Sequence, residues 1–139
     1  SIATHIVAAP AYLAQHGTPK HPGDLSHHRL LHYSNLNGPW RFRRADGTEV
    51  AVRADGPLTA NSGEALVPSL LAGLGIARLP GFIIGPHLES GSVVPVLADW
   101  PPPPIGLHLM TPPSRLRPAR VEALIAFLAE TLVDPCAGR

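Results

Sequence analysis

The stretch ANSGEALVPSLLAGLGIARLP, residues 60–80, runs from a polar Asn-Ser-Gly cluster through an apolar ladder to two glycines and a short apolar segment. Apolar residues recur in it at positions i, i+3, i+4 and i+7, namely Val67, Leu70, Leu71 and Leu74. This spacing predicts a helix that buries one face against a sheet. Gly75 is placed to take the left-handed conformation that stops such a helix, and residues 76–79 predict a strand.

The polar start of this stretch admits two interpretations. Asn61 or Ser62 can accept a hydrogen bond from a first-turn N–H group, a cap worth about 1 kcal/mol relative to alanine. The same N–H groups and the positive end of the helix dipole also favour an anion. Pro68 lacks an N–H and crowds the carbonyl four residues earlier, so we expect the helix to start near Ala65 or to be kinked. For the cluster taken alone, a structural cap is the simpler interpretation.

Strands and helices alternate along the rest of the chain. We predict strands at residues 2–9, 30–33, 40–44, 49–53, 58–60, 93–97 and 105–110. Further helices are expected at residues 10–17, 81–89 and 118–132, with a loop at residues 18–24 and a stiff connector at the prolines 101–104. The last helix carries an apolar stripe of Val121, Leu124, Ile125, Leu128 and Leu132. This alternation predicts an α/β fold with partly parallel sheets.

Length and charge bound the possible functions. With 139 residues and 45% hydrophobic content, the chain is long enough for one compact domain. A net charge of +1 is too balanced for the basic face that duplex DNA requires. The single cysteine, Cys136, has no disulfide partner in the chain and favours a reducing compartment. No apolar run approaches the ~20 residues that span a bilayer, so we expect a cytoplasmic protein without membrane contact.

Metal and catalytic patterns are weak. His28 and His32 have the spacing of two zinc ligands on a helix, but their segment favours a strand and no Cys or acidic third ligand follows, so no metal site is expected. The Ser62-Gly63-Glu64 run lacks the G-x-S-x-G elbow, and neither a P-loop nor a full dinucleotide-binding glycine pattern occurs. We therefore expect no enzyme activity, no catalytic residue and no cofactor.

Basic residues cluster on the predicted hairpin of residues 40–53. They are Arg41, Arg43, Arg44 and Arg53. With Asp46 and Glu49 as partners, the simplest interpretation is a solvated face. The functional alternative is a contact with a neighbouring subunit.

Five motifs occur in the order typical of one family. They are VAAPAYLAQHGTPKHPGDLSHHRLLHYS (residues 7–34), WRF (40–42), G-x-L-x-A-N (56–61), AGLGIARLP (72–80) and LESGSVVPVLADW (88–100), followed by the terminal helix. Their order and spacing cover nearly all of residues 6–132. The chain therefore resembles the C-terminal portion of the effector-binding domain of LysR-type transcriptional regulators.

The resemblance implies an α/β fold of periplasmic-binding-protein type (type 2). Such a domain has two lobes, joined by two crossover segments, with a small-molecule cleft between them. Residues 1–9 would be the end of the first lobe and the first crossover, residues 10–103 the second lobe, and residues 104–139 the return to the first lobe with a helix and tail. We expect the DNA-binding helix-turn-helix and most of the first lobe to lie outside this sequence.

The resemblance also implies an effector site in the cleft. Six residues fall at positions that contact the effector in the family: Pro10, Ser34, Asn35, Asn61, Ser62 and Phe82. For Ser34 and Asn35 the alternative is turn chemistry, and for Phe82 it is core packing. Hydroxyl and amide donors near a helix N-terminus suit a small carboxylate, so an anionic effector is expected.

The predicted function is that of a sensor. Effector binding would alter how an N-terminal helix-turn-helix holds DNA, in a homo-oligomer (dimer or tetramer) that touches DNA only through that module. A nearly neutral sensing domain is compatible with this division of labour. The alternative is a stand-alone solute-binding domain without a DNA-linked role.

Overall fold

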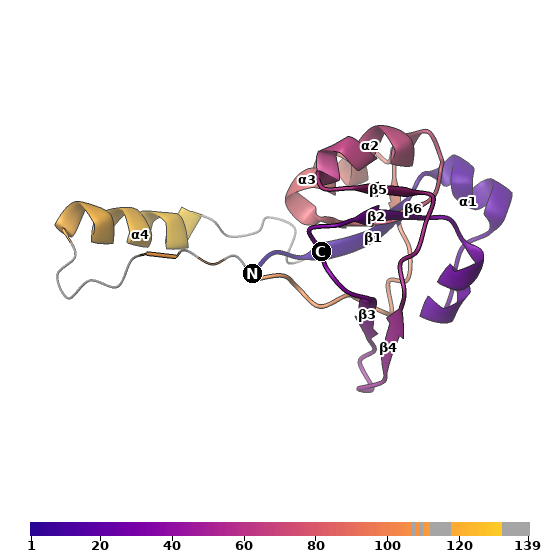
Figure 1. The fold of residues 1–139 in the computed structure, drawn as a ribbon, viewed down its shortest axis with the longest axis horizontal. Coiled ribbons are helices and arrows are strands. Elements are labelled where there is room, and N and C mark those ends of the chain that lie inside the picture. Colours follow the sequence, from indigo (N-terminus) through magenta and orange to yellow (C-terminus); the bar gives the residue numbers. More distant parts are fainter. Residues whose placement is uncertain (107, 109, 112–117, 132–139) are drawn as a thin grey trace.

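The computed structural model describes residues 1–106, 108, 110–111 and 118–131 of the chain (Figure 1). Its elements are, in order, β1 (Thr4–Ala8), α1 (Pro10–His16), the 3-10 helix η1 (Pro22–His27), β2 (Leu30–Tyr33), β3 (Trp40–Arg43), β4 (Glu49–Val52), β5 (Leu58–Ala60), α2 (Gly63–Leu71), β6 (Ile76–Pro80), α3 (Gly81–Glu89), β7 (Val94–Pro95) and α4 (Ala119–Thr131). The predicted alternation of strands and helices is confirmed.

A mixed five-stranded sheet organises the fold, with strand order β5-β2-β6-β1-β7. β2 runs parallel to both β5 and β6, whereas β1 is antiparallel to β6 and β7. In the β1–β6 ladder Thr4 lies opposite Pro80 and Ala8 lies opposite Ile76. The carboxyl ends of β2, β5 and β6 therefore meet at one edge of the sheet, at the end where β1 begins.

Both faces of the sheet are buried. On one face α2 and α3 pack over a core of Val7, Leu31, Leu66, Leu70, Ala77, Leu79, Ile84 and Val93. On the other face α1, η1 and the β3–β4 hairpin contribute to a core of Ile6, Ala8, Tyr12, Leu25, Leu30, Trp40, Phe42, Ala54, Ile76, Val96, Leu97 and Trp100. All five residues of β6 are buried, as expected of a central strand covered on both sides.

The buried stripe of α2 differs from the prediction. Leu66 and Leu70 are fully buried, whereas Leu71 is 39% and Leu74 is 46% exposed. The helix ends at Leu71, so Leu74 lies beyond it and cannot extend the stripe. The prediction that Leu71 and Leu74 are buried was wrong.

The ends of α2 also differ from expectation. The helix begins at Gly63 and continues through Pro68, so a start near Ala65 was wrong, whereas the alternative of a kink stays a prediction. Gly73, with φ of 73°, takes the left-handed conformation that we assigned to Gly75. Gly75 is constrained for another reason, because a Cβ there would collide with the carbonyl oxygen of Arg29.

Part of the predicted loop at residues 18–24 is helical. Residues 22–27 form η1, whose start is closed by a capping box between His21 and Asp24. The Asp24 Oδ2 atom accepts hydrogen bonds from the backbone N–H groups of Lys20 (3.0 Å) and His21 (2.9 Å). These bonds hold the pKa of the Asp24 carboxyl below its ordinary value.

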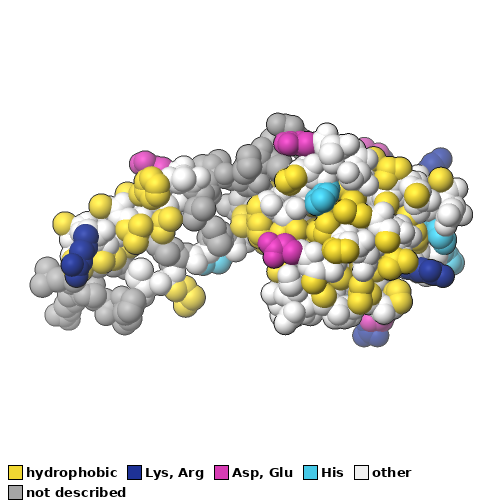
Figure 2. All heavy atoms as spheres, turned by 90° about the horizontal axis from the view of Figure 1, so that it is seen from above, with side chains coloured by type: hydrophobic (Ala, Val, Ile, Leu, Met, Phe, Trp, Pro, Cys, Tyr) yellow, Lys and Arg dark blue, Asp and Glu magenta, His cyan; other side chains and the backbone are white. Residues whose placement is uncertain are grey.

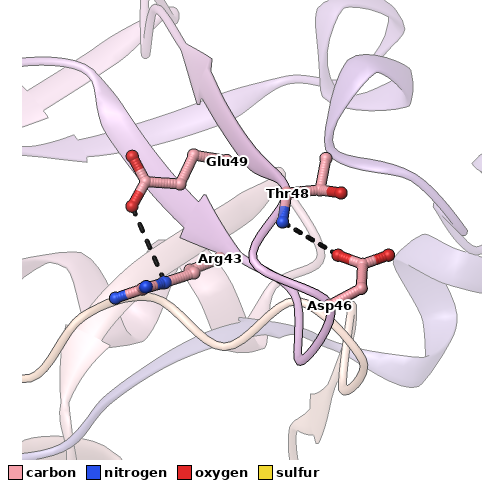
Figure 3. Close-up of polar contacts among 4 residues, drawn as sticks. All are labelled: Arg43, Asp46, Thr48 and Glu49. Carbon is pink, nitrogen blue, oxygen red and sulfur yellow. Dashed lines mark hydrogen bonds and ion pairs between the residues drawn. The ribbon is translucent and has the colours of Figure 1, made fainter.

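The β3–β4 hairpin has the predicted solvated face (Figure 3). Arg43 Nε lies 3.7 Å from Glu49 Oε1, and Arg44 Nη1 lies 3.8 Å from Asp46 Oδ2. The Thr48 N–H donates to Asp46 Oδ1 at 2.8 Å, which closes the turn. All these ion-paired side chains are exposed, so the pairs contribute little to stability.

Two predicted strands near the C-terminus are shorter than expected. The strand expected at residues 93–97 is reduced to β7. Of residues 105–110, Ile105 forms an isolated bridge with Ile2, while residues 107 and 109 lie outside the described residues.

β1 lies between β6 and β7, among the strands of the predicted second lobe. Residues 4–8 thus group with residues 10–103, and a boundary before Thr4 fits the sheet better than one at residue 9. The lobe boundaries themselves stay a prediction.

The C-terminal helix α4 is present as predicted, but its apolar side chains are uncovered. None of its residues is buried, and Leu124 and Phe127 are 55% and 60% exposed. Figure 2 shows hydrophobic side chains on the surface of this helix. Leu132, the last predicted member of the stripe, lies outside the described residues.

Tyr12 joins α1 to the segment that leads into β2. Its hydroxyl accepts a hydrogen bond from the Arg29 N–H (3.0 Å) and lies 3.2 Å from Nδ1 of His28. Its ring also stacks on His16, with the ring centroids 4.4 Å apart. The hydroxyl can donate its hydrogen to Nδ1 when neutral His28 carries its own hydrogen on Nε2. Burial, followed by the nearby charge of His16, lowers the pKa of His28.

The lowered pKa of His28 predicts a pH-dependent stability. The folded state favours neutral His28, so the unfolded state takes up a proton first as the pH falls through its ordinary pKa of about 6.5. The free energy of unfolding should be fully retained above that pH and fall progressively below it. Urea unfolding between pH 8 and pH 5 measures this. In the His28→Asn variant, whose amide oxygen can accept the Tyr12 hydrogen, the loss in this window should disappear; an unchanged pH profile would contradict the assignment.

Candidate functional site

Predicted effector residues, four of them polar and one aromatic, follow the three parallel strands at the edge where these strands end. Ser34 and Asn35 follow β2, Asn61 and Ser62 follow β5, and Phe82 follows β6. The structure thus brings five of the six predicted effector residues to one edge of the sheet. Their role in effector binding stays a prediction.

Hydrogen bonds tie the β2 and β5 ends together. The Ser34 N–H donates to the Ala60 carbonyl at 2.9 Å, and the Ser34 hydroxyl donates to the same oxygen at 3.3 Å. Asn35 Nδ2 donates to the Asn61 carbonyl at 2.9 Å. Part of the polar chemistry at this edge is therefore turn chemistry, the alternative weighed from the sequence for Ser34 and Asn35.

Ser62 is the N-cap of α2. Its hydroxyl oxygen accepts a hydrogen bond from the Ala65 N–H at 3.4 Å, so the structural interpretation of the polar cluster is confirmed for this residue. Capping uses the oxygen as an acceptor and leaves the hydroxyl hydrogen available to another group. Ser62 can cap the helix and still face a ligand.

A second helix, α3, starts at the same edge. Pro80 is its N-cap residue and supplies no side-chain hydrogen bond. The starts of α2 and α3 are close, because a Cβ added to Gly63 would lie 2.6 Å from Cδ1 of Ile83. The positive dipole ends of two helices thus point to one side, an arrangement that favours an anion.

Phe82 lies in the first turn of α3 and is 61% exposed. The core-packing alternative for this residue is therefore wrong. A large apolar side chain beside polar groups at an open edge has the character of a binding-site wall.

Pro10 is not brought together with the other five residues. It begins α1, directly after β1, and the end of β1 pairs with Ile76 at the start of β6. Pro10 consequently lies at the opposite edge of the sheet. The sequence did not reveal that β1 runs antiparallel to β6, and this direction places the start of β1 at the polar edge.

Two chain segments run side by side near the start of β1. Ile2 and Ile105 exchange backbone hydrogen bonds of 2.8 and 2.9 Å, and the Thr4 hydroxyl donates to the Pro103 carbonyl at 3.4 Å. The segments before Thr4 and after Pro101 are therefore paired beside the candidate site.

Arg78 of β6 was not singled out from the sequence. It is 7% exposed, and its enclosed Nε has no hydrogen-bond partner. No described residue forms an ion pair with it. Burial lowers the pKa of its guanidinium. One signal was available: Arg78 is a charged residue within a strand that otherwise reads as apolar.

His32 of β2 also has an enclosed side-chain nitrogen, Nδ1, without a hydrogen-bond partner. Since Leu30 pairs with Ile76 and both point into the core shared with the hairpin, His32 and Arg78, two residues further along, are neighbours on the same face. The zinc pair considered from the sequence is not formed on a helix, because His28 follows η1 and His32 lies in a strand.

A groove in the surface is lined by other residues. A groove of about 730 Å³ runs beside β1, and its lining includes His5, Leu88, Glu89 and Leu97. None of the six predicted effector residues lines it. In the described part of the chain, no three His, Cys, Asp or Glu residues are placed to hold a metal ion, and no helix is long and apolar enough to cross a membrane.

The sheet and its covering helices define an α/β domain of periplasmic-binding-protein type. The family model described as the LysR substrate binding domain matches residues 3–133, and the chain belongs to that family. The resemblance stated from the sequence motifs is therefore confirmed.

Relatives and solved structures support the same family assignment. A putative transcriptional regulator of Pseudomonas aeruginosa is 40% identical over 124 residues, covering 86% of this chain and 40% of that protein. The HTH-type transcriptional regulator PtxR of the same species is 33% identical over 127 residues, covering 91% of this chain and 41% of that protein. The full-length structure of AphB, a Vibrio cholerae virulence activator, aligns with a TM-score of 0.69 at 33% identity over 74% of this chain and 35% of that one. The regulatory domain of CrgA from Neisseria meningitidis aligns with a TM-score of 0.61 at 31% identity over 73% of this chain and 52% of that one. The chain thus spans about two fifths of the length of these curated relatives.

The N-cap assignment of Ser62 makes a measurable prediction. Ser62→Ala should lower the free energy of unfolding by about 1 kcal/mol, whereas Ser62→Asp, which can still accept from the Ala65 N–H, should retain it. Chemical denaturation of the three proteins measures the difference. An equal loss in both variants would show that the hydroxyl stabilises the fold through something other than the cap.

Proposed function

We propose that this chain is the effector-sensing part of a LysR-type transcriptional regulator, in which a small anionic molecule bound between two lobes alters DNA binding by an N-terminal helix-turn-helix. The observation that carries this proposal is the edge where β2, β5 and β6 end. Four polar residues, one exposed aromatic ring and two helix N-termini converge there. Membership of the family and the regulator names of the relatives support the same function.

The paired segments at Ile2 and Ile105 suggest how the lobes are connected. Two chain segments crossing together at one edge of a sheet have the geometry required of a hinge. The effector would bind the closed arrangement of the lobes more tightly than the open one, and this difference in affinity is what shifts the equilibrium.

The uncovered helix α4 fits the same proposal. Its exposed Leu124 and Phe127 would pack against the first lobe, to which residues 104–139 return. Burial of such a stripe is the main source of stability for an amphipathic helix. In this proposal the regulator is a cytoplasmic homo-oligomer and touches DNA only through its N-terminal module.

We further propose that the chain has no enzymatic role. The Ser62 oxygen accepts a hydrogen bond from the Ala65 N–H. Among the described residues, no histidine forms a hydrogen bond with Ser62 that would let it act as a general base. A serine nucleophile requires such a base.

The experiment is a transcription reporter driven by the promoter adjacent to the gene that encodes the chain. A panel of small carboxylic acids is supplied to cells with and without that gene. We expect at least one acid to change reporter output only when the gene is present. Asn61→Leu, which places an apolar side chain at the polar edge, should reduce this response at least tenfold while promoter binding in a gel-shift assay is unchanged.

A matched control is Arg41→Leu on the exposed face of the hairpin, which should respond like the natural protein. A response that survives Asn61→Leu would move the effector site away from this edge. An absence of promoter binding by the complete gene product would favour a stand-alone solute-binding domain and overturn the regulator proposal.

A further inference from the structure

We infer that Arg78 and His32 form a buried carboxylate-binding subsite beneath the polar edge of the sheet, which takes the carboxylate of the proposed effector. The inference rests on the proposed function for the identity of that ligand. It rests on the structure for the position of the subsite and for its chemistry.

Arg78 is a buried charge that forms no ion pair with a described residue. Its side chain is among the few buried polar ones of the described core, and its enclosed Nε is unsatisfied. The ion pairs formed among the described residues lie on the hairpin, between Arg43 and Glu49 and between Arg44 and Asp46, and neither involves Arg78. Buried charges in proteins are normally paired, and buried polar groups are normally hydrogen-bonded. An unpaired buried arginine is therefore suited to bind an anion.

His32 adds a second unsatisfied nitrogen on the same face. Its strand, β2, is parallel to β6, and the register places it beside Arg78. With hydrogen on Nδ1, its imidazole offers a donor next to the guanidinium fork. Neither side chain has another described partner to which these atoms are committed.

The position of the pair connects it to the candidate site. His32 lies two residues before Ser34, and Arg78 lies two residues before the N-cap of α3. Two strand residues span roughly 7 Å, so the pair lies one pleat below the edge. A molecule bound at Ser34 and Asn61 can direct an anionic group toward His32 and Arg78.

The chemistry selects a carboxylate. A guanidinium presents parallel N–H groups that match the two oxygens of a planar carboxylate. The surrounding side chains on this face, such as Ile6 and Ile76, are apolar, so the attraction acts in a region of low dielectric. Apolar surroundings also favour a monocarboxylate over an anion with several charges.

The test follows the Arg78 side chain directly. In the 15N-labelled chain, its Nε–Hε resonance is assigned by its loss in Arg78→Met and then followed during titration with sodium acetate and sodium isobutyrate. Sodium chloride at matched ionic strength is the reference. We expect a saturable shift with either carboxylate and none with chloride. A linear shift, or an equal shift with chloride, overturns the inference. Tighter binding of inorganic phosphate than of acetate overturns the carboxylate assignment.

Thermal unfolding gives an independent readout. Acetate should raise the Tm of the natural chain and of the control Arg41→Met, which removes an exposed arginine. It should raise the Tm of Arg78→Met by less than a tenth as much. Arg78→Lys, which keeps the charge but loses the fork, should bind acetate at least tenfold more weakly than the natural chain. Equal stabilisation of all four proteins overturns the inference. Should Arg78→Met fail to fold, Arg78→Lys assigns the resonance, because lysine also lacks the Nε–Hε group, and the titration and the lysine variant then decide alone.

The two proposals fail separately. Saturable acetate binding at Arg78 without any reporter response to acids would sink the regulator proposal and keep the subsite. A reporter response that is unchanged in Arg78→Lys, together with a silent Nε–Hε resonance, would sink the subsite and keep the regulator.

Discussion

The antiparallel ladder between β1 and β6 is the constraint on which the rest of the structure depends. β6 is buried along its whole length and carries β2 on one side and β1 on the other. Its parallel pairing with β2 places the polar ends of these strands at one edge. Its antiparallel pairing with β1 brings the chain start and the proline connector to that same edge, through the Ile2–Ile105 bridge. One strand thus positions the candidate site and the paired segments beside it.

The edge combines stabilising and binding chemistry in the same residues. Ser62 caps α2, and Asn35 joins two loops by its hydrogen bond to the Asn61 carbonyl. Both residues lie near the N-terminal, positive ends of helix dipoles. Arg78 is the opposite case, because an unpaired buried charge costs on the order of several kcal/mol and stabilises nothing that is visible here. Natural proteins usually break a local rule of this kind at functional sites. The conflict at Arg78 is a stronger indication of binding than the cap at Ser62.

Much of the architecture could be predicted because it is encoded locally. Proline at the start and a glycine stop gave α1, and apolar periodicity gave α4. The polar residues after β2 and β5 were grouped by the family resemblance, and the parallel pairing of these strands explains why they lie at one edge. The strand directions could not be predicted this way, because the partner of β1 lies more than sixty residues away in the sequence. Pro10 was grouped with residues at the other edge because the resemblance placed it at a crossover, and no strand direction was available from the sequence to separate them.

Other differences have similar physical origins. Leu74 does not extend the buried stripe of α2 because the helix ends at Leu71. Gly73 follows this end in the left-handed conformation and lies near Tyr12. The η1 helix was missed because its cap uses a histidine nitrogen in place of the usual hydroxyl. Arg78 was passed over because, from the sequence, an arginine in a strand can equally face solvent; only the covering of both sheet faces shows that it is buried.

The most direct test of the central claim is a map of backbone amide shifts in the 15N-labelled chain, titrated with the acid that induces the reporter. If the carboxyl edge of the parallel strands is the sensing site, the largest shifts will fall at residues 34–35, 61–63 and 81–82, while residues 10–16 and 22–28 stay unchanged. Shifts centred on the Tyr12 end of the sheet, or on the groove beside β1, would contradict the account.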